Sequence, residues 1–264
     1  MKRIDLPSAF YRLLGEELYA PSEAVIGPWS PDQQHGGPPL ALLAHALRTH
    51  EAGRDMHLVR LAVELLGPLP VQPCRVQVET LRPGRRVELL RACLSSQGRD
   101  LMLAHAWRFE AAELGSLPAP HPYQAPPLPP PQEQRFWRGI DYFPYGQAVE
   151  WRFAEGSLEH PGPATVWTRP RIPLLEGQPL HPLEALALMI DSANGISGEL
   201  DILRWTFVPV DMTLTLLRPP QGEWFGMSAR THLGSAGAGQ TRAVAFDELG
   251  VVGESLQTLF IRPR

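Results

Sequence analysis

The chain is organised around residues His181–Gly195, whose sequence is HPLEALALMIDSANG. This pattern predicts one helix over Pro182–Asn194, because proline suits the first turn and glycine suits the position just past the end. Apolar side chains recur at helical spacing and nearly surround the helix, so we expect it to be buried. Asp191 falls on the apolar side. A buried carboxylate is costly, so Asp191 is either satisfied by hydrogen bonds or kept for chemistry.

The composition is that of an ordinary globular protein. The 264 residues are 44% hydrophobic and 20% charged, which allows a sizeable core in one or two domains. A formal net charge of -4 argues against a nucleic-acid partner. We see no signal peptide and no membrane-spanning run, and therefore expect a cytoplasmic protein. The two cysteines have no metal-type spacing, and we expect no metal and no separate cofactor.

A second buried helix is predicted directly after a pair of glycines. His35-Gly36-Gly37 leads through two prolines into residues 40–48, which are almost wholly apolar. Adjacent glycines let another group approach the N–H groups at the positive end of a helix, although a tight loop alone would also need them. Residues 10–18 are predicted to form a short amphipathic helix. Four runs over residues 58–109 alternate with a period of two and indicate an antiparallel meander.

The order of helix and strands then returns. In the second half, Pro219 ends the first strand and Gly250 marks the last turn. Pro68 and Gly98 stand at the same two places in the first half. Their offsets are 219 minus 68, or 151, and 250 minus 98, or 152, so the unit is repeated. Eight prolines between residues 118 and 131 predict a linker.

The repeat predicts the domain organisation. We expect an N-terminal domain over residues 1–116, a proline-rich linker over residues 117–134 and a C-terminal domain over residues 135–264. Each domain should be a central helix wrapped by a curved antiparallel sheet, and the two sheets can pair edge to edge. Sheet or helix faces could also pair two copies of the chain into a homo-oligomer.

These features resemble the hotdog fold, and their tandem repeat resembles the double-hotdog acyl-CoA thioesterases of the type II, TesB-like family. The resemblance implies an α+β fold and a hydrolase of fatty acid metabolism. Such an enzyme uses activated water to cleave acyl-CoA thioesters to the free acid and CoA, and CoA is part of the substrate. The matching motifs are His35-Gly36-Gly37, Gly84-Arg85-Arg86, Arg218-Pro219 with Glu223-Trp224, Asp247 to Gly250, and Gln257.

The resemblance also implies the site residues. The catalytic Asp of the family corresponds to Asp191 and its Gln to Gln257, whereas its Thr position falls on Pro209, which has neither hydroxyl nor N–H. Thr213 and Thr215 share the strand parity of Pro209, and Thr206 lies just before it, but none stands at the family position. Thr213 is the candidate hydroxyl. In this scheme Asp191 is the base, Gln257 holds the water, and N–H groups at a helix start polarise the carbonyl. The predicted substrate-binding residues are His35, Gly36 and Gly37.

Other interpretations remain open. Pro209 favours a non-catalytic acyl-CoA or acyl-carrier binding protein of the same fold. A structural role would have Asp191 satisfied by neighbouring donors and Gln257 in an inter-strand hydrogen bond. A hotdog hydratase or dehydratase pairs an Asp with a His a few residues later, and no such His follows Asp191. Zinc-ligand spacing and a serine-nucleophile signature are both missing from the sequence.

Overall fold

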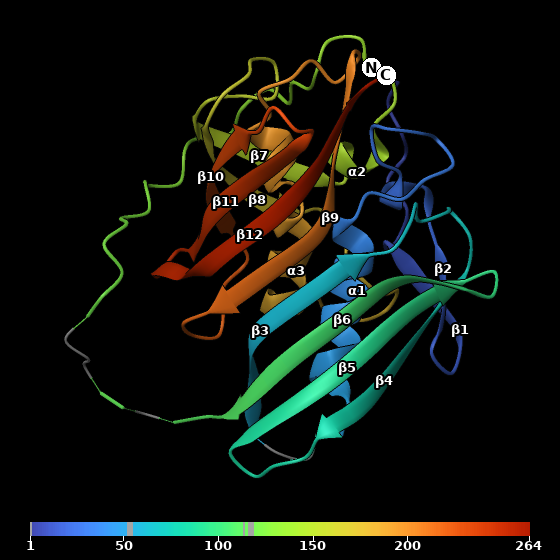
Figure 1. Cartoon of the computed structure of the whole chain (residues 1–264), viewed down its shortest axis with the longest axis vertical. Coiled ribbons are helices and arrows are strands. Elements are labelled where there is room, and N and C mark those ends of the chain that lie inside the picture. The colour runs from blue at the N-terminus through green and yellow to red at the C-terminus, as the bar shows by residue number, and fades with distance from the viewer. Residues whose placement is uncertain (1, 52–54, 113, 116–118) are drawn as a thin grey trace.

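Two helices lie against one face of a single curved sheet of twelve strands (Figure 1). The computed structural model describes residues 2–51, 55–112, 114–115 and 119–264. Read outward from the centre of the sheet, the strand order is β3-β6-β5-β4-β2-β1 on one side and β9-β12-β11-β10-β8-β7 on the other. The two halves therefore have the same topology, which confirms the predicted double hotdog.

Each half supplies six strands and one long helix. The first half contains β1 (Tyr11–Gly15), β2 (Leu18–Pro21), the 3-10 helix η1 (Glu23–Val25), α1 (Gly37–Thr49), β3 (Met56–Leu65), β4 (Cys74–Arg82), β5 (Val87–Ser96) and β6 (Arg99–Glu110). The second half contains α2 (Pro144–Gln147), β7 (Val149–Glu155), β8 (Ala164–Pro170), α3 (Pro182–Ile190), α4 (Ala193–Ile196), β9 (Trp205–Leu216), β10 (Phe225–Leu233), β11 (Ala238–Asp247) and β12 (Gly250–Pro263).

The two halves join at the centre of the sheet. Strands β3 and β9 pair antiparallel, with Arg60–Glu64 opposite Asp211–Thr215. This is the predicted edge-to-edge pairing, and it removes two edges that would otherwise be exposed. Residues 205–210 of β9 continue past the last paired residue of β3, because β3 ends at Leu65. The cavity described below lies at this divergence.

The predicted helix over residues 10–18 is wrong. The structure instead has the short hairpin of β1 and β2, with Glu17 at a φ of 59° in its turn. The N–H groups of Phe10 and Tyr11 donate to the carbonyls of Pro173 and Leu174 in the second half. These long-range hydrogen bonds, together with burial of both rings, outweigh a weak local helical preference.

The proline-rich segment packs on the outer face of the second half. Tyr123, Ala125 and Leu128 contact a buried cluster of Trp167, Trp224 and Phe246. The indole N–H of Trp167 also donates to the carbonyl oxygen of Pro126 at 3.1 Å. The predicted domain boundary at residues 116 and 117 lies outside the described residues. Among the described residues, no helix is both long enough and apolar enough to cross a membrane.

Candidate active site

Helix α3 ends at Ile190, one residue before Asp191. Its carbonyl at Leu188 accepts a hydrogen bond of 2.8 Å from the Tyr145 hydroxyl, whereas the N–H of Ser192 donates to Met189. The hydrogen bond of Ser192 spans three residues, so the last turn of α3 is tighter than an α-helical turn. The chain becomes helical again in α4, and the predicted unbroken helix from Pro182 to Asn194 is therefore wrong. The interruption makes Asp191 the C-cap of α3, so its side chain projects from the end of the helix.

Gly36, the N-cap of α1, and Gly37, its first residue, let this helix approach the end of α3 closely. A Cβ atom on Gly37 would lie 2.1 Å from the Leu188 carbonyl oxygen, and one on Gly36 would lie 2.7 Å from Oδ1 of Asp191. Pro38 and Pro39 follow and have no N–H, so the N–H groups near the start of α1 come from Gly36 and Gly37. Gly36 borders the cavity, whereas Gly37 makes the helix contact.

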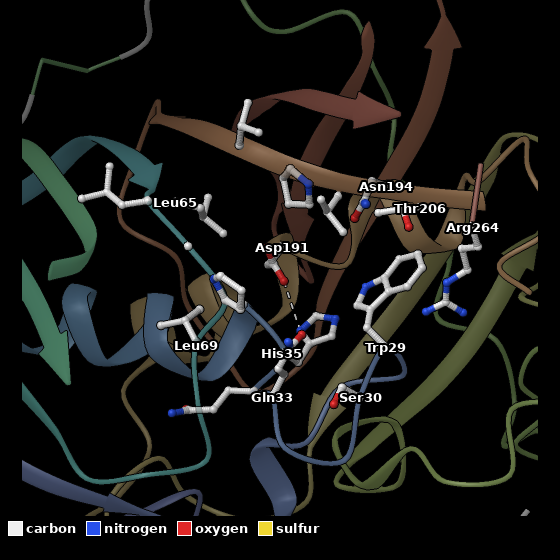
Figure 2. Close-up of a pocket in the computed structure, with 18 residues that line it drawn as sticks. Trp29, Ser30, Gln33, His35, Leu65, Leu69, Asp191, Asn194, Thr206 and Arg264 are labelled. Carbon is white, nitrogen blue, oxygen red and sulfur yellow. Dashed lines mark ion pairs between the residues drawn. The ribbon is translucent and has the colours of Figure 1, made fainter. Parts of the chain in front are cut away.

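Asp191 and His35 form a buried pair between the two halves (Figure 2). Nδ1 of His35 lies 3.1 Å from Oδ2 of Asp191, and their side chains are 13% and 7% exposed. The N–H of Gly37 is also 3.1 Å from this Nδ1 and donates to it in the tautomer that carries its proton on Nε2. The imidazole stacks on the Tyr145 ring, with centroids 3.9 Å apart and planes 10° apart. These contacts hold the histidine ring against the carboxylate.

Burial shifts both groups toward their neutral forms. It raises the pKa of Asp191 to about 7, although a hydrogen bond from the Gly37 N–H opposes this shift. Burial also lowers the pKa of His35 to about 3, so the ring is neutral near pH 7. Within the described chain, Asp191 has no ion-pair partner other than this neutral ring. The carboxylate therefore gains or loses its proton near neutral pH, as a general base requires.

The pair borders a cavity of about 520 Å³. The cavity lies where β9 continues beyond β3, and the end of β3 and the following turn form one side through Leu65 and Leu69. Trp29 and Arg264 lie on the other side, with Asp191 and His35 between (Figure 2). Most of its wall is apolar, as is typical of small-molecule sites.

Gln257 contacts the main chain of Asp191. Its Nε2 donates to the main-chain carbonyl of Asp191 at 3.1 Å and lies 3.6 Å from the sulfur of Met212. The side chain is completely buried, and its Oε1 has no hydrogen-bond partner among the described residues. Gln257 does not border the cavity. The structure thus brings Gln257 to Asp191, but to its backbone and not to its carboxylate.

Thr213 lies away from the site. Asp211 pairs with Thr258 and Pro209 with Leu259, so Val210 is an extra residue that forms a β-bulge. One extra residue exchanges the two faces of a strand, which places Pro209 on the inner face and Thr213 on the outer face. Thr213 was selected because it lies an even number of residues from Pro209, but the bulge between them puts the two side chains on opposite faces. Pro209 borders the cavity and Thr213 does not.

Two family matches cover most of the chain. Residues 25–109 match the acyl-CoA thioesterase N-terminal domain, and residues 122–261 match the acyl-CoA thioesterase C-terminal domain. The chain belongs to the acyl-CoA thioesterase family. The two matched ranges correspond to the two halves of the sheet, so the tandem arrangement is that of the family. Among curated proteins, the comparison found no match to this sequence.

Solved structures of low sequence identity share the fold along nearly the whole chain. A conserved hotdog-fold protein of unknown function from Alicyclobacillus acidocaldarius is 17% identical, with a TM-score of 0.72 and coverage of 96% of this chain and 95% of that one. An acyl-CoA thioesterase II, TesB2, from Mycobacterium marinum is 18% identical, with a TM-score of 0.68 and the same coverages. A tesB protein from Mycobacterium avium subspecies paratuberculosis is 16% identical, with a TM-score of 0.66 and 96% coverage of both chains.

The sequence missed three parts of this site. The bond between His35 and Asp191 joins residues far apart in the chain, and only the glycines beside His35 pointed to it. Tyr145 lies in an irregular aromatic segment with no periodic pattern. Arg264 directly follows the 14-residue strand β12 and borders the cavity, a position that no local sequence pattern indicated.

Proposed function

We propose that this protein hydrolyses acyl-CoA thioesters with water activated by Asp191. The observation that carries the proposal is a buried carboxylate in a cavity wall, with no cation beside it among the described residues and a pKa raised by burial to about 7. Structural carboxylates in protein interiors are normally neutralised by a cation. Membership of the acyl-CoA thioesterase family supports a thioester as the bond that is cleaved.

Asp191 and Gly36 have separate roles in the proposed reaction. Asp191 takes a proton from water as the water oxygen attacks the thioester carbon. The Gly36 N–H, near the positive end of α1, donates to the carbonyl oxygen as it gains charge. The C–S bond then breaks, and the departing thiolate takes the proton back from Asp191. The products are the free acid and the thiol, and no covalent enzyme intermediate forms.

His35 and Gln257 position the base in this scheme. In the tautomer protonated on Nδ1, His35 donates to the ionised carboxylate, and the Gly37 N–H donates to the carboxylate and no longer to Nδ1. Stacking on Tyr145 holds the ring in place. Gln257 supports the main chain of Asp191 through its 3.1 Å hydrogen bond. Its Oε1 has no hydrogen-bond partner among the described residues, but Gln257 does not border the cavity, so the water-holding role that the family resemblance implies requires a water to reach this buried atom.

A binding protein without activity is the second candidate. Pro209 borders the cavity at the position where the family resemblance places a catalytic hydroxyl. Proline supplies neither a hydroxyl nor an N–H to orient a water molecule. A protein that keeps the cavity and the Asp191–His35 pair would still bind an acyl thioester.

The deciding experiment is hydrolysis of a panel of acyl-CoAs from short to long chain, with release of free thiol as the readout. Calorimetric titration of the same acyl-CoAs measures binding separately. Turnover by the wild type, with loss of turnover but not of binding in Asp191→Asn, supports the hydrolase. Binding without thiol release at any chain length would instead establish the binding protein.

A further inference from the structure

The cavity has two chemically different ends. Leu65 and Leu69 form an apolar side, and Trp29 and Arg264 lie across the Asp191–His35 pair from them (Figure 2). Of the described residues that border the cavity, Arg264 is the only lysine or arginine. An acyl-CoA is similarly asymmetric, because its acyl end is apolar and its carrier end bears a nucleotide and several phosphate charges.

Arg264 is held in place without being neutralised. Its main-chain N–H donates to the carbonyl of Arg204 at 2.9 Å, and its guanidinium donates to the carbonyl of Ile202 at 3.1 Å. The guanidinium carbon lies 5.2 Å from the centre of the Trp29 ring, a cation–π distance. No carboxylate within the described part of the chain forms an ion pair with Arg264. Its charge is therefore available to an anionic ligand.

Trp29 also packs against an aromatic residue of β9. Its ring meets the Phe207 ring edge-on, with centroids 5.2 Å apart and planes 81° apart. Phe207 belongs to β9, and its carbonyl accepts from the Asn194 side chain at the cavity wall. An anchored indole beside an uncompensated guanidinium offers both an aromatic face and a phosphate donor, which is the chemistry that a nucleotide requires.

We propose that Trp29 and Arg264 bind the phosphorylated nucleotide end of the thiol carrier, with the acyl group directed toward Leu65 and Leu69. This inference rests on the proposed function, because it takes an acyl-CoA as the substrate. It fixes the direction in which the substrate lies across the Asp191–His35 pair. It also makes Arg264 a specificity residue that separates CoA thioesters from thioesters of uncharged thiols.

The test uses two substrates that share one acyl group. One is the acyl-CoA, and the other is the acyl-pantetheine thioester, which keeps the reacting bond and the amide arm but has no phosphate. In Arg264→Gln we expect KM for the acyl-CoA to rise about tenfold with kcat nearly unchanged, since one charge-assisted contact is lost. KM for the acyl-pantetheine should stay the same. The effect should not vary with acyl chain length.

Arg262→Gln is the matched control. Arg262 is the neighbouring arginine of β12, but its guanidinium lies over the Phe260 ring and donates to the carbonyl of Ile261. It does not border the cavity. We expect KM for both substrates to match the wild type, which separates a local contact from a general change of charge.

Two results would overturn the inference. An equal rise of KM for both substrates in Arg264→Gln would show that Arg264 shapes the site without contacting phosphate. If the wild type hydrolyses neither substrate, calorimetric titration of free CoA decides the matter independently of catalysis. Binding of CoA weakened by Arg264→Gln but not by Arg262→Gln would support the inference, and equal CoA affinity in all three proteins would contradict it.

Discussion

Each end of the α1–α3 helix pair holds a carboxylate and a histidine, but the pKa of the carboxylate differs between the two ends. The helices lie side by side with opposite directions, so the start of α1 meets the end of α3 and the reverse. Each end has a buried carboxylate beside a histidine. Asp191 lies 3.1 Å from Nδ1 of His35 at one end, and Glu184 lies 2.8 Å from Nδ1 of His45 at the other.

The difference between the ends lies in what neutralises the carboxylate. Glu184 also accepts from Arg48 at 2.8 Å and from the main-chain N–H of His181 in a capping box. Burial raises the pKa of Glu184, but these hydrogen bonds outweigh it and hold the pKa below its usual value. In the part of the chain that the structure describes, no cation lies beside Asp191, and burial raises its pKa to about 7. A tandem fold can thus use one end for structure and keep the other for proton transfer.

The largest expected effect comes from Asp191→Asn. This change keeps the shape of the side chain but removes the proton acceptor, so kcat should fall by roughly a hundredfold or more. Thiol release measured at equal folded concentration, with acyl-CoA affinity from calorimetry, gives the result. A variant that hydrolyses acyl-CoA as fast as the wild type would end the catalytic role of Asp191.

The free energy of unfolding of Asp191→Asn should depend less on pH than that of the wild type. The pKa of Asp191 is raised from 3.8 in a model peptide to about 7 when folded, so the wild type loses free energy of unfolding as pH rises across this window. The amide that replaces the carboxyl group does not ionise, and we expect Asp191→Asn to be at least as stable as the wild type above pH 7. Thermal melts at pH 5 and pH 8 measure the difference. A variant that is less stable at both pH values would mean that the carboxylate is a structural group.

Glu184→Gln should have the opposite profile. Removing this charge leaves the Arg48 guanidinium without its anionic partner, and we expect the free energy of unfolding to fall by about 3 kcal/mol. Turnover per folded molecule should stay near that of the wild type, because Glu184 does not border the cavity. Chemical denaturation and the thioesterase assay check both parts. A large loss of turnover with unchanged stability would mean that both ends serve the reaction.

The two glycines give a smaller but separable pair of effects. A methyl group on Gly37 would meet the Leu188 backbone at 2.1 Å, so Gly37→Ala should cost about 2 kcal/mol of stability. A methyl group on Gly36 meets the Asp191 carboxylate, so Gly36→Ala should lower kcat more than the melting temperature. Gly15→Ala is the control, since open space surrounds that Cβ position. Equal effects of all three changes would contradict this division.

The sequence predicted the parts of the fold that depend on local pattern and repetition. The offsets of Pro219 and Gly250 from their first-half counterparts were sufficient to predict a repeated unit with paired sheets, which the shared strand order confirms. The double hotdog itself came from the family resemblance. The helical stripe was sufficient to place Asp191 on a buried surface. Both signals arise from side-chain periodicity, which the sequence contains directly.

The parts that sequence analysis missed depend on single residues and distant partners. One extra residue at Val210 exchanges the faces of β9, so Thr213 was assigned to the wrong side. Helix α3 ends early because the Leu188 carbonyl accepts a hydrogen bond from the hydroxyl of Tyr145, which lies more than forty residues earlier in the chain. The hairpin of β1 and β2 forms against carbonyls of the second half. None of these contacts leaves a periodic signal in the sequence.

The central claim is that Asp191 is a general base whose proton is lost near neutral pH. The pH dependence of kcat/KM for acyl-CoA hydrolysis tests it most directly, because this ratio reports ionisations of the free enzyme. Only the ionised carboxylate accepts a proton, so the rate should rise with pH through a midpoint near 7, the pKa to which burial raises Asp191. A kcat/KM that is constant between about pH 5.5 and pH 8.5 would contradict the claim.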